Sequence, residues 1–393
     1  MNYRQCLSYL EQIQNLGIKF GLNNVRTILA SLDNPQQKYP SILVAGTNGK
    51  GSVCAMLLRI LSLHGFKAGL FTSPHLVQIG ERVRIGEKII SKGDFGRLLT
   101  VLREKIEELI TKEKLSSPPT FFELLTCLAL LYFKEKDIDM AILEVGMGGR
   151  YDATNAVLPC VCVITSISFE HQKFLGETLQ EIAFEKAGII KPGVPVVCGD
   201  ENIEASETIK RRAGELKAPL IEVFSQKGCF KVKKETKSYS FEYRSNGEKF
   251  SFSPSLAGWH QGKNAAIAIV ASEQLSKKWK KLQRDKIIRG IETVRWEGRL
   301  EILSHEPLVI VDGAHNEEGA KALRRYVQDF ISSPLTLIFA IMRDKKIEDL
   351  AEILFPLADR IILTRLPYYR AALPEEIRER AAGYQGKMTL IPD

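Results

Sequence analysis

The segment GTNGKGS, residues 46–52, lies between a strand-like and a helix-like run and could bind phosphate. In such a segment, backbone N–H groups and a helix N-terminus hold phosphate oxygens, while a lysine, here Lys50, reaches the outer phosphates. The hydroxyl of Ser52 could be a ligand of Mg²⁺. The segment departs twice from the pattern G-x-x-x-x-G-K-[ST], because Val44 replaces its first glycine and Gly51 follows the lysine. It is therefore a damaged nucleotide site, a different kind of nucleotide site, or only a glycine-rich turn.

Two further side chains could bind a metal ion. Glu144 ends the strand-like run MAILE, where its carboxylate could face the phosphate segment as an oxygen ligand of Mg²⁺. Taken alone, it is more simply interpreted as a surface glutamate at a strand end. His171 follows the run VITSISFE, and a single histidine in a sequence is more often structural. It becomes a second metal ligand if it lies near Glu144, which the sequence leaves open.

A third group of polar residues lies farther along the chain. Asp312 and His315 belong to the segment VDGAHN, and Arg299 precedes them in the segment EGRLE. An aspartate that binds a ribose hydroxyl, with a histidine and an arginine near a domain boundary, would suit a nucleotide held between two domains. The alternative is a strand-to-helix turn with local hydrogen bonds.

Glu123 has a structural interpretation. In the segment TFFE, Thr120 stands at a helix N-cap position and Glu123 three residues later. This spacing is typical of a capping box, and a long apolar run follows it. The sequence therefore predicts a helix that begins just after Thr120.

These residues need a scaffold that brings them together. Strand-like apolar runs alternate with helix-like segments through about the first 200 residues, which predicts a mostly parallel α/β sheet. Ligands of such sheets gather at the carboxyl ends of the strands. The expected strands occupy residues 41–46, 67–73, 140–146, 160–167 and 194–199, and the expected helices include residues 51–65 and 121–136.

The pattern changes near residue 222. From there to residue 256, apolar and polar residues alternate, and Asn246-Gly247 between two such runs predicts a hairpin in a small antiparallel β region. A second series of alternating strands and helices begins at residue 307. We therefore expect an α/β protein with a mostly parallel-sheet domain over residues 1–294, which is a P-loop ATPase domain if residues 46–52 bind ATP, and a smaller C-terminal Rossmann-like domain over residues 295–393.

Bulk composition narrows the class of protein. The 393 residues are 45% hydrophobic and 26% charged, and no apolar run is long enough to cross a membrane. The N-terminal segment does not resemble a signal peptide, so we expect a cytoplasmic protein. The net charge of +8 permits an anionic partner, but the basic residues are dispersed and no RNA-binding aromatic motif is present. We expect a solvated surface or a site for acidic small molecules, without nucleic acid or membrane.

Together the motifs resemble the folylpolyglutamate synthase and dihydrofolate synthase family, a branch of the ATP-dependent Mur ligase superfamily. The resemblance covers roughly residues 15–345, and its most specific segments are GTNGKGS and LEVGMGGRYDATN. Other matching segments, in the family's order, include SPHL, TFFE, ITSISFEH, EKAGIIK, HQGKNAAIA, GRLE and VDGAHN. The family's loop is itself GTNGKG[ST], so both departures noted above are its normal form.

The resemblance implies roles for particular residues. For ATP it implies contacts from Asn48, Gly49, Lys50, Gly51, Ser52, Asn264, Arg299 and Asp312. For Mg²⁺ it implies Ser52, Ser73, Glu144 and His171. For the pterin pocket it implies the stretch 20–25, including Gly21 and Leu22, together with Phe122, Glu123 and Asp152.

Lys186, in the segment EKAGI, resembles the lysine that the family carries as a carbamate. This change makes chemical sense because an ammonium group cannot be a metal ligand, whereas a carbamate is an anionic oxygen donor. The resemblance also implies that His315 lies near the reacting centre. The expected catalytic residues are therefore Lys50, Lys186 and His315.

The implied reaction is ATP-driven formation of an amide bond. The carboxylate of dihydropteroate or of a reduced folate takes the γ-phosphoryl group to give an acyl phosphate, while Lys50 and Mg²⁺ counter the charge on the transferring group. The α-amine of L-glutamate then attacks, and phosphate leaves. Because residues of both domains take part, closure of the domains would exclude water. We expect a monomer.

The sequence departs from the family's pattern at several points. Glu170 precedes His171 where the family usually has aspartate, and Asn316 lacks the proline that commonly follows it. The segment RIGEKI is one residue shorter than the common form. The sequence ends at MTLIPD, before a helix and strand that members usually carry, so we expect a shortened C-terminal domain and an altered glutamate side of the site.

Two alternatives stay open. One is a Mur-type ligase that adds an amino acid to a cell-wall nucleotide, although such members usually have threonine or serine in place of Gly51. The other is a nucleotide-binding homologue without ligase activity, which the short C-terminus would suit.

Overall fold

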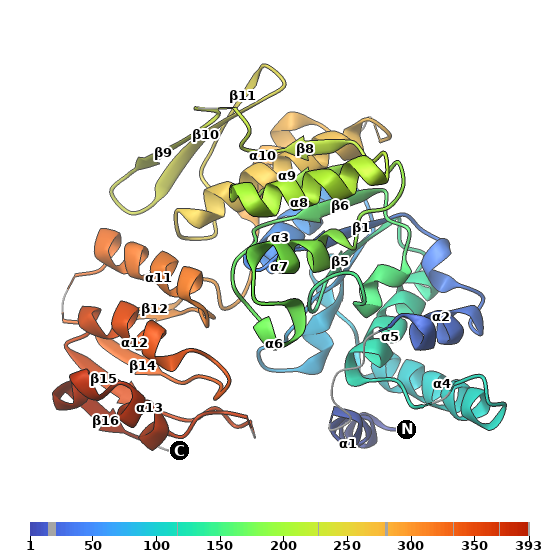
Figure 1. Cartoon of the computed structure of the whole chain (residues 1–393), viewed down its shortest axis with the longest axis horizontal. Helices are drawn as coiled ribbons and strands as arrows, with labels where there is room; N and C mark the ends of the chain where they lie inside the picture. Colours follow the sequence, from blue (N-terminus) through green and yellow to red (C-terminus); the bar gives the residue numbers. More distant parts are fainter. Residues whose placement is uncertain are drawn as a thin grey trace. The chain divides into compact units, whose positions relative to one another are not determined.

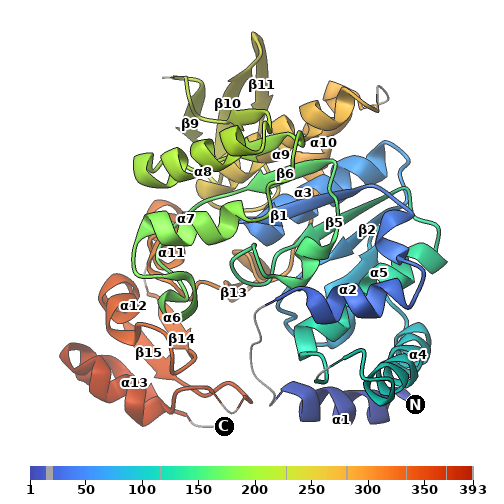
Figure 2. The ribbon, with the colours of Figure 1, turned by 45° about the vertical axis from the view of Figure 1, so that its right-hand side comes forward.

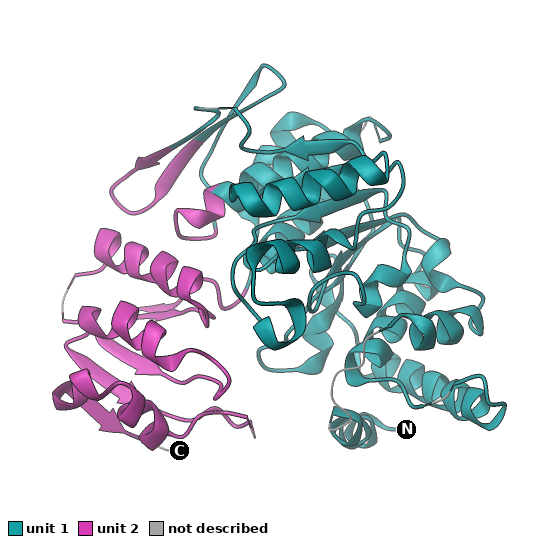
Figure 3. Cartoon of the chain, viewed as in Figure 1, with its two compact units in different colours: residues 1–231, 242–255, 263–296 teal, residues 232–241, 256–262, 297–393 magenta. Residues whose placement is uncertain are grey.

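The computed structural model divides into two compact units, which Figure 3 shows in two colours. Unit 1 consists of residues 1–231, 242–255 and 263–296, and unit 2 of residues 232–241, 256–262 and 297–393. Within these units the structure describes residues 1–14, 21–115, 117–226, 228–279, 282–332, 334–368 and 370–391. Among the described residues, no helix combines the length and the apolar character that a membrane crossing requires.

An eight-stranded sheet forms the centre of unit 1 (Figures 1 and 2). Its strand order is β4-β3-β2-β5-β1-β6-β7-β8, and the six strands from β2 to β8 run parallel, while β3 and β4 add an antiparallel edge. The mostly parallel sheet was predicted. The strands are β1 (Ser41–Ala45), β2 (Ala68–Phe71), β3 (Val83–Ile85), β4 (Lys88–Ile89), β5 (Met140–Glu144), β6 (Val161–Ile164), β7 (Val196–Cys198) and β8 (Leu220–Glu222).

The central strands are apolar because helices cover both of their faces. Every residue of β1 is buried, which is typical of a strand inside a parallel sheet. Leu43 and Ala45 belong to one core, whereas Ile42 and Val44 alternate with them and point to the other face. Figure 2 shows α3 and α9 on one side of this sheet and α2 and α5 on the other.

The helices of unit 1 include the two whose predicted ranges are given above. Residues 51–65 and 121–136 correspond to α3 (Lys50–Leu63) and α5 (Phe121–Glu135). The others are α1 (Tyr3–Gln14), α2 (Asn23–Ala30), α4 (Lys92–Thr111), α6 (Gln172–Leu175), α7 (Leu179–Ala187), α8 (Ile203–Glu215), α9 (His260–Ser276) and α10 (Arg284–Thr293). The division between the two units falls within α9, after residue 262.

The predicted hairpin is present in a three-stranded sheet of β9 (Phe230–Lys234), β10 (Tyr239–Ser245) and β11 (Glu248–Phe252). Asn246 and Gly247 connect β10 to β11 with φ angles of 49° and 82°. A two-residue connection with two positive φ angles joins neighbouring strands in antiparallel fashion. The division between the units also falls within β9 and within β10.

Unit 2 contains the predicted α/β series with one difference. The strands β14 (Thr336–Phe339), β15 (Arg360–Leu363) and β16 (Met388–Leu390) form a parallel sheet with α11 (Glu317–Phe330), α12 (Ile347–Leu354) and α13 (Pro374–Arg380) between or beside them. The first predicted strand, β13 (Leu308–Val311), instead pairs with β12 (Glu301–His305) in a separate antiparallel sheet. Only Glu306 and Pro307 separate these two strands, and so short a connection favours antiparallel pairing of neighbours.

Candidate functional site

Four adjacent strands of the parallel sheet, in the order β2-β5-β1-β6, deliver predicted site residues to one edge. Ser73 follows β2, Glu144 ends β5, the loop 46–52 follows β1, and His171 lies in the segment after β6. Parallel strands have their carboxyl ends at the same edge of a sheet, where ligands of this architecture bind. These four segments of the chain therefore leave the sheet at the same edge.

The loop after β1 is shaped by two glycines. Gly46 and Gly49 have φ angles of 140° and 85°, which side chains rarely adopt. A Cβ on Gly46 would lie 1.9 Å from Thr165 Oγ1, and a Cβ on Gly49 would lie 2.3 Å from Asn264 Oδ1. Both positions therefore require glycine for their conformation and for space.

A hydroxyl-rich segment after β6 fixes the loop. The backbone N–H of Thr47 donates to Ser166 O at 2.6 Å, and the N–H of Ser168 donates to Thr47 Oγ1 at 3.1 Å. Thr165 Oγ1 donates to Asn48 O at 2.6 Å, while the Asn48 N–H donates to Ser166 Oγ at 3.2 Å. The sequence analysis missed this clamp, although the run TSIS, residues 165–168, at the end of a predicted strand offered a signal.

Lys50 folds back over the loop. Its ammonium group donates to Gly46 O at 2.8 Å and to Thr47 O at 3.0 Å. A phosphate bound by the loop would compete with these carbonyl oxygens for the same N–H donors. Ser52 lies in the first turn of α3 and is buried.

Glu144 and Ser73 meet at the ends of neighbouring strands. The Ser73 N–H donates to Glu144 Oε2 at 3.2 Å, and the Glu144 side chain is buried. The same Oε2 lies 3.7 Å from the position that a Cβ on Gly51 would take. His171 adopts a left-handed conformation, with φ 46°, at the start of α6. Its proximity to Glu144, on which its role as a metal ligand depends, stays a prediction.

A buried ion pair lies beside the loop. Lys186 in α7 is 1% exposed, and its Nζ lies 2.5 Å from Glu170 Oε1 and 2.9 Å from Gly46 O. Burial, assisted by nearby Lys50, lowers the pKa of Lys186 to about 8 although Glu170 opposes this. Burial acts to raise the pKa of Glu170, but Lys186 and Lys50 outweigh it and lower that pKa to about 2. Glu170, which the sequence analysis noted only as a departure, is thus the partner of the predicted catalytic lysine.

Unit 2 gathers Arg299, Asp312 and His315 around the turn after β13. The Asp312 carboxylate accepts from Leu300 N at 2.9 Å and from Ala314 N at 2.8 Å, and burial raises its pKa although these bonds and Arg299 oppose the shift. His315 is exposed, with Nδ1 2.8 Å from Gly313 O. The local hydrogen bonds of the turn interpretation are therefore present, and the nucleotide roles of the three residues stay predictions.

Two of the predicted pterin-pocket residues hold local structure. Glu123 forms the expected capping box, because its Oε2 accepts from Thr120 N at 2.6 Å and its N–H donates to Thr120 Oγ1 at 3.3 Å. Asp152 accepts from Gly146 N, Met147 N, Thr154 N and Thr154 Oγ1 at 2.5–3.0 Å. Burial raises the pKa of Asp152 even though these bonds favour the carboxylate. Asp152 therefore shapes the loop after β5.

The other predicted pterin-pocket residues lie close to this loop in the fold. Leu22 caps α2, Phe122 lies in the first turn of α5, and Asp152 caps the 3₁₀ helix η3 (Ala153–Ala156). The elements α2, α5 and η3 pack against one another. The Phe122 ring lies 2.6 Å from the Cβ position of Gly146, so that this glycine leaves room for the ring. Gly21 immediately precedes Leu22, whereas position 20 lies outside the described residues.

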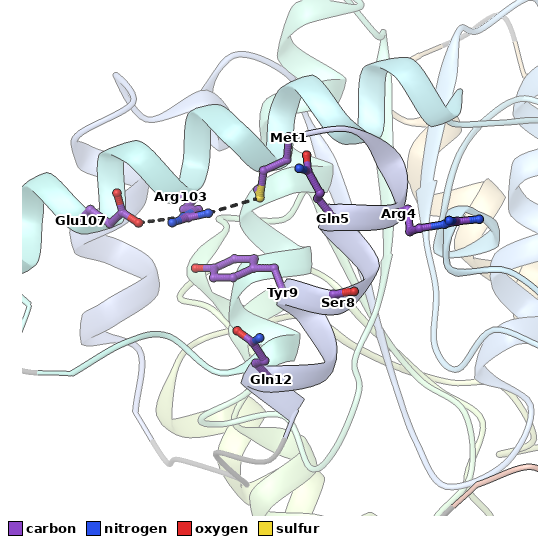
Figure 4. A pocket seen from close by; sticks show the side chains of 8 residues that line it. All are labelled: Met1, Arg4, Gln5, Ser8, Tyr9, Gln12, Arg103 and Glu107. Atoms are coloured by element: carbon purple, nitrogen blue, oxygen red, sulfur yellow. Dashed lines mark hydrogen bonds and ion pairs between the residues drawn. The ribbon is translucent and has the colours of Figure 1, made fainter.

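A separate surface cavity of about 650 Å³ lies between α1 and α4 (Figure 4). Arg103 there bonds to Glu107 at 2.7 Å and to Met1 Sδ at 3.6 Å, and Arg4 points away from the other labelled side chains. The cavity is lined by Met1, Arg4, Gln5, Ser8, Tyr9, Gln12, Arg103 and Glu107. None of the predicted site residues is among them.

Comparison with protein families matches most of the chain to one superfamily. The description "Mur ligase middle domain" matches residues 44–272, and "Mur ligase, glutamate ligase domain" matches residues 298–393. The fold and the phosphate loop thus define a Mur ligase, an ATP-dependent ligase.

Comparison with an individual relative identifies the family within the Mur ligases. The chain is 35% identical over 379 residues to a Bacillus subtilis dihydrofolate synthase/folylpolyglutamate synthase, which covers 95% of this chain and 88% of that protein. The chain belongs to the folylpolyglutamate synthase and dihydrofolate synthase family.

Solved structures agree with this assignment. Folylpolyglutamate synthase from Thermotoga maritima matches with a TM-score of 0.86 and 34% identity, over 100% of this chain and 90% of that one. The bifunctional folylpolyglutamate synthase/dihydrofolate synthase from Yersinia pestis, complexed with AMPPNP and a Mn ion, matches with a TM-score of 0.85 and 28% identity, over 100% and 90% of the two chains. ATP and a divalent metal are accordingly the cofactors of this family.

Proposed function

We propose that this protein joins the α-amine of L-glutamate to the carboxylate of dihydropteroate and of reduced folates, with ATP as the source of energy. The observation that carries the proposal is the convergence of the phosphate loop, Ser73, Glu144 and the Lys186–Glu170 pair at one sheet edge. The name of the Bacillus subtilis relative, which includes both activities, supports both acceptors. The cell-wall alternative has less support, because the relatives named above act on folates.

The loop 46–52 would bind the phosphates of ATP through backbone N–H groups at the start of α3. Lys50 would exchange its bonds to Gly46 O and Thr47 O for bonds to phosphate oxygens and would counter the charge that develops as the γ-phosphoryl group moves to the acceptor carboxylate. The products of this step are ADP and an acyl phosphate. The glutamate amine then forms the amide bond, loses a proton, and releases phosphate. We propose Asn264, Arg299 and Asp312 as further nucleotide contacts and His315 as a residue near the reacting centre.

The donor set at the sheet edge fits Mg²⁺. Mg²⁺ is usually held by one or two carboxylates together with substrate phosphates, rather than by a cage of protein ligands. The part of the chain that the structure describes contains no group of three Cys, His, Asp or Glu side chains suited to a metal ion. Glu144, the hydroxyls of Ser52 and Ser73, and His171 would hold the ion, which would neutralise phosphate charge.

Lys186 would carry a carbamate. Only a neutral amine reacts with CO₂, and the lowered pKa of about 8 makes the neutral amine of Lys186 far more abundant near neutral pH than that of an exposed lysine. Its burial beside the loop supports a role close to the phosphates. Gly21, Leu22 and Phe122 would line the pterin pocket, with Glu123 and Asp152 beside them.

The decisive experiment supplies the purified protein with ATP, Mg²⁺, L-[¹⁴C]glutamate and either dihydropteroate or tetrahydrofolate. We expect labelled product with both acceptors, and none when ATP is omitted. Product with one acceptor only would assign a single activity. A cell-wall nucleotide precursor serves as the rival acceptor, and product with it alone would contradict the proposal.

The absence of product with every acceptor, in protein that still binds ATP, would instead support the homologue without ligase activity. Lys50→Ala provides a matched control in the same assay. It should remove product formation, because the loop would lose the ammonium group that faces the phosphates.

A further inference from the structure

We propose that Trp296 is a positioning residue of the phosphate loop, and that its indole is the reason why residue 51 is glycine. A Cβ on Gly51 would lie 3.0 Å from Trp296 Nε1 and 3.5 Å from Trp296 Cε2. The first distance is tighter than nearly all Cβ contacts. The inference rests on the proposed binding of ATP by this loop, and it adds a residue to which neither the sequence motifs nor the comparisons assign a role.

The conformation of Gly51 does not explain its identity. Gly51 lies in the first turn of α3 and has no positive φ, unlike Gly46 and Gly49. In a helix, alanine is favoured over glycine by about 1 kcal/mol. The chain therefore keeps a glycine where the backbone would accept a better helix former. Space is the remaining reason, and Trp296 is the nearest neighbour that occupies it.

The indole also contacts an arginine. The guanidinium carbon of Arg84, in β3, lies 5.1 Å from the centre of the Trp296 ring, within the range of a cation–π interaction. Arg84 Nε also donates to Glu81 O at 3.2 Å, which ties the guanidinium to the segment before β3. Arg84, Trp296 and Gly51 thus form a stack that runs from the sheet edge to the start of α3.

This stack accounts chemically for the departure at position 51. In the common phosphate loop, the residue after the lysine is Ser or Thr and supplies a hydroxyl to Mg²⁺. Here the indole of Trp296 takes the space beside position 51, and Glu144 Oε2 lies 3.7 Å from the same point. A carboxylate oxygen therefore lies close to the position that a hydroxyl on residue 51 would take. The indole fixes the helix start against that carboxylate.

A double-mutant cycle tests this coupling. The variants are Gly51→Ala, Trp296→Phe and the double variant, and the measurement is the dissociation constant for ATP with Mg²⁺. Gly51→Ala should weaken binding about fivefold to a hundredfold, because an extra methyl group in a packed site is costly. In the double variant, the smaller ring should restore most of the lost affinity. Effects that simply multiply would overturn the inference, since independent sites are additive in free energy.

Trp279→Phe is the matched control, because it removes an indole from the same unit but one that packs against Lys278. Its combination with Gly51→Ala should show no rescue. ATP should change the fluorescence of the wild type and of Trp279→Phe but not of Trp296→Phe. An equal response in all three proteins would contradict a contact between Trp296 and the loop.

Thermal unfolding of the same variants gives a readout that needs no ligand. Coupling between positions 51 and 296 should appear there as well, because the contact exists without nucleotide. If the wild type fails to bind ATP, the proposed function fails, whereas the unfolding cycle still decides the packing relation. Additive shifts in unfolding temperature would overturn that relation.

Discussion

Glu170 sets the charge environment of two lysines. Its carboxylate forms a buried ion pair with Lys186. Its negative charge also interacts favourably with the nearby ammonium group of Lys50. Removing one partner of a buried pair leaves the other charge uncompensated, which is more damaging than losing a surface ion pair. The pair therefore matters for stability as well as for the proposed chemistry.

Replacement of Glu170 should change how stability depends on pH. The folded-state pKa of about 2 lies below the ordinary glutamate value of 4.5, so the carboxylate contributes stability that is full above pH 4.5 and is lost as pH falls through about 2. Glu170→Gln should cost about 3 kcal/mol at pH 7 and should flatten the loss of stability between pH 4.5 and 2. Urea unfolding at several pH values measures both effects. The control is Glu177→Gln, an exposed glutamate, which should leave the curve unchanged.

Carbamate formation on Lys186 should increase as the pH rises above neutral. Because the pKa of Lys186 is lowered to about 8, the neutral amine increases steeply from pH 7 to pH 9. With [¹³C]bicarbonate and a fixed concentration of CO₂, a carbamate signal in the ¹³C NMR spectrum should grow over this interval and be absent in Lys186→Ala. The alanine variant should lose ligase activity and regain part of it with short carboxylic acids. An unchanged spectrum in Lys186→Ala would count against the carbamate.

At the scale of elements, variants at the start of α5 can distinguish a structural role of Glu123 from a role in substrate binding. Thr120→Ala removes the N-cap hydroxyl and should lower the free energy of unfolding by about 1 kcal/mol. Glu123→Gln should preserve stability, because glutamine also completes a capping box. Urea unfolding gives these values, and the KM for dihydropteroate is measured in parallel. A raised KM in a stable Glu123→Gln protein would support contact with the pterin, and an unchanged KM would leave the residue with its structural role.

The sequence predicted the elements better than their contacts. The strands that carry the site were predictable because the apolar runs and the residues that follow them are local properties. The turn between β1 and α3 was predictable because Gly46 and Gly49 favour positive φ angles, whereas the binding of phosphate by this turn stays a prediction. The clamp by Thr165 and Ser166 was not, because it joins segments more than 100 residues apart.

Two other features depended on pairing that a single sequence does not reveal. The strand at 308–311 fits a parallel series by composition, yet it pairs with its nearest neighbour along the chain. In the sequence, Trp296 is an apolar residue just after the expected domain boundary, and only the fold brings its ring to Gly51. Side-chain contacts between distant segments are thus the part of the site that local patterns leave out.

At the scale of the molecule, the two units share single elements, and β10 offers a direct test. Tyr239 belongs to unit 2, where its ring lies 4.9 Å from that of Phe330 and its hydroxyl bonds to Asp329. Tyr243, four residues on, belongs to unit 1 and donates to Val223 O at 2.9 Å. Both side chains are buried.

Hydrogen exchange of the intact protein should distinguish the two tyrosines. Tyr239→Ala removes a buried aromatic ring at a cost of about 3 kcal/mol and should raise amide exchange in α11. Tyr243→Ala makes the same chemical change and should instead raise exchange around Val223, with α11 unaffected. Exchange that rises in both places for both variants would mean that the two units do not respond separately.

The division of the chain has a consequence for recombination and protein engineering. The family description of the glutamate ligase domain begins at residue 298, but the compact unit also contains residues 232–241 and 256–262, which come from the stretch matched to the middle domain. A graft that exchanges only residues 298–393 between relatives would therefore bring α11 without the native tyrosine and tryptophan that cover it, Tyr239 and Trp259. The glutamate ligase domain of the family description and the compact unit 2 of the structure therefore contain different residues. A functional chimera of this family has to transfer three segments rather than one.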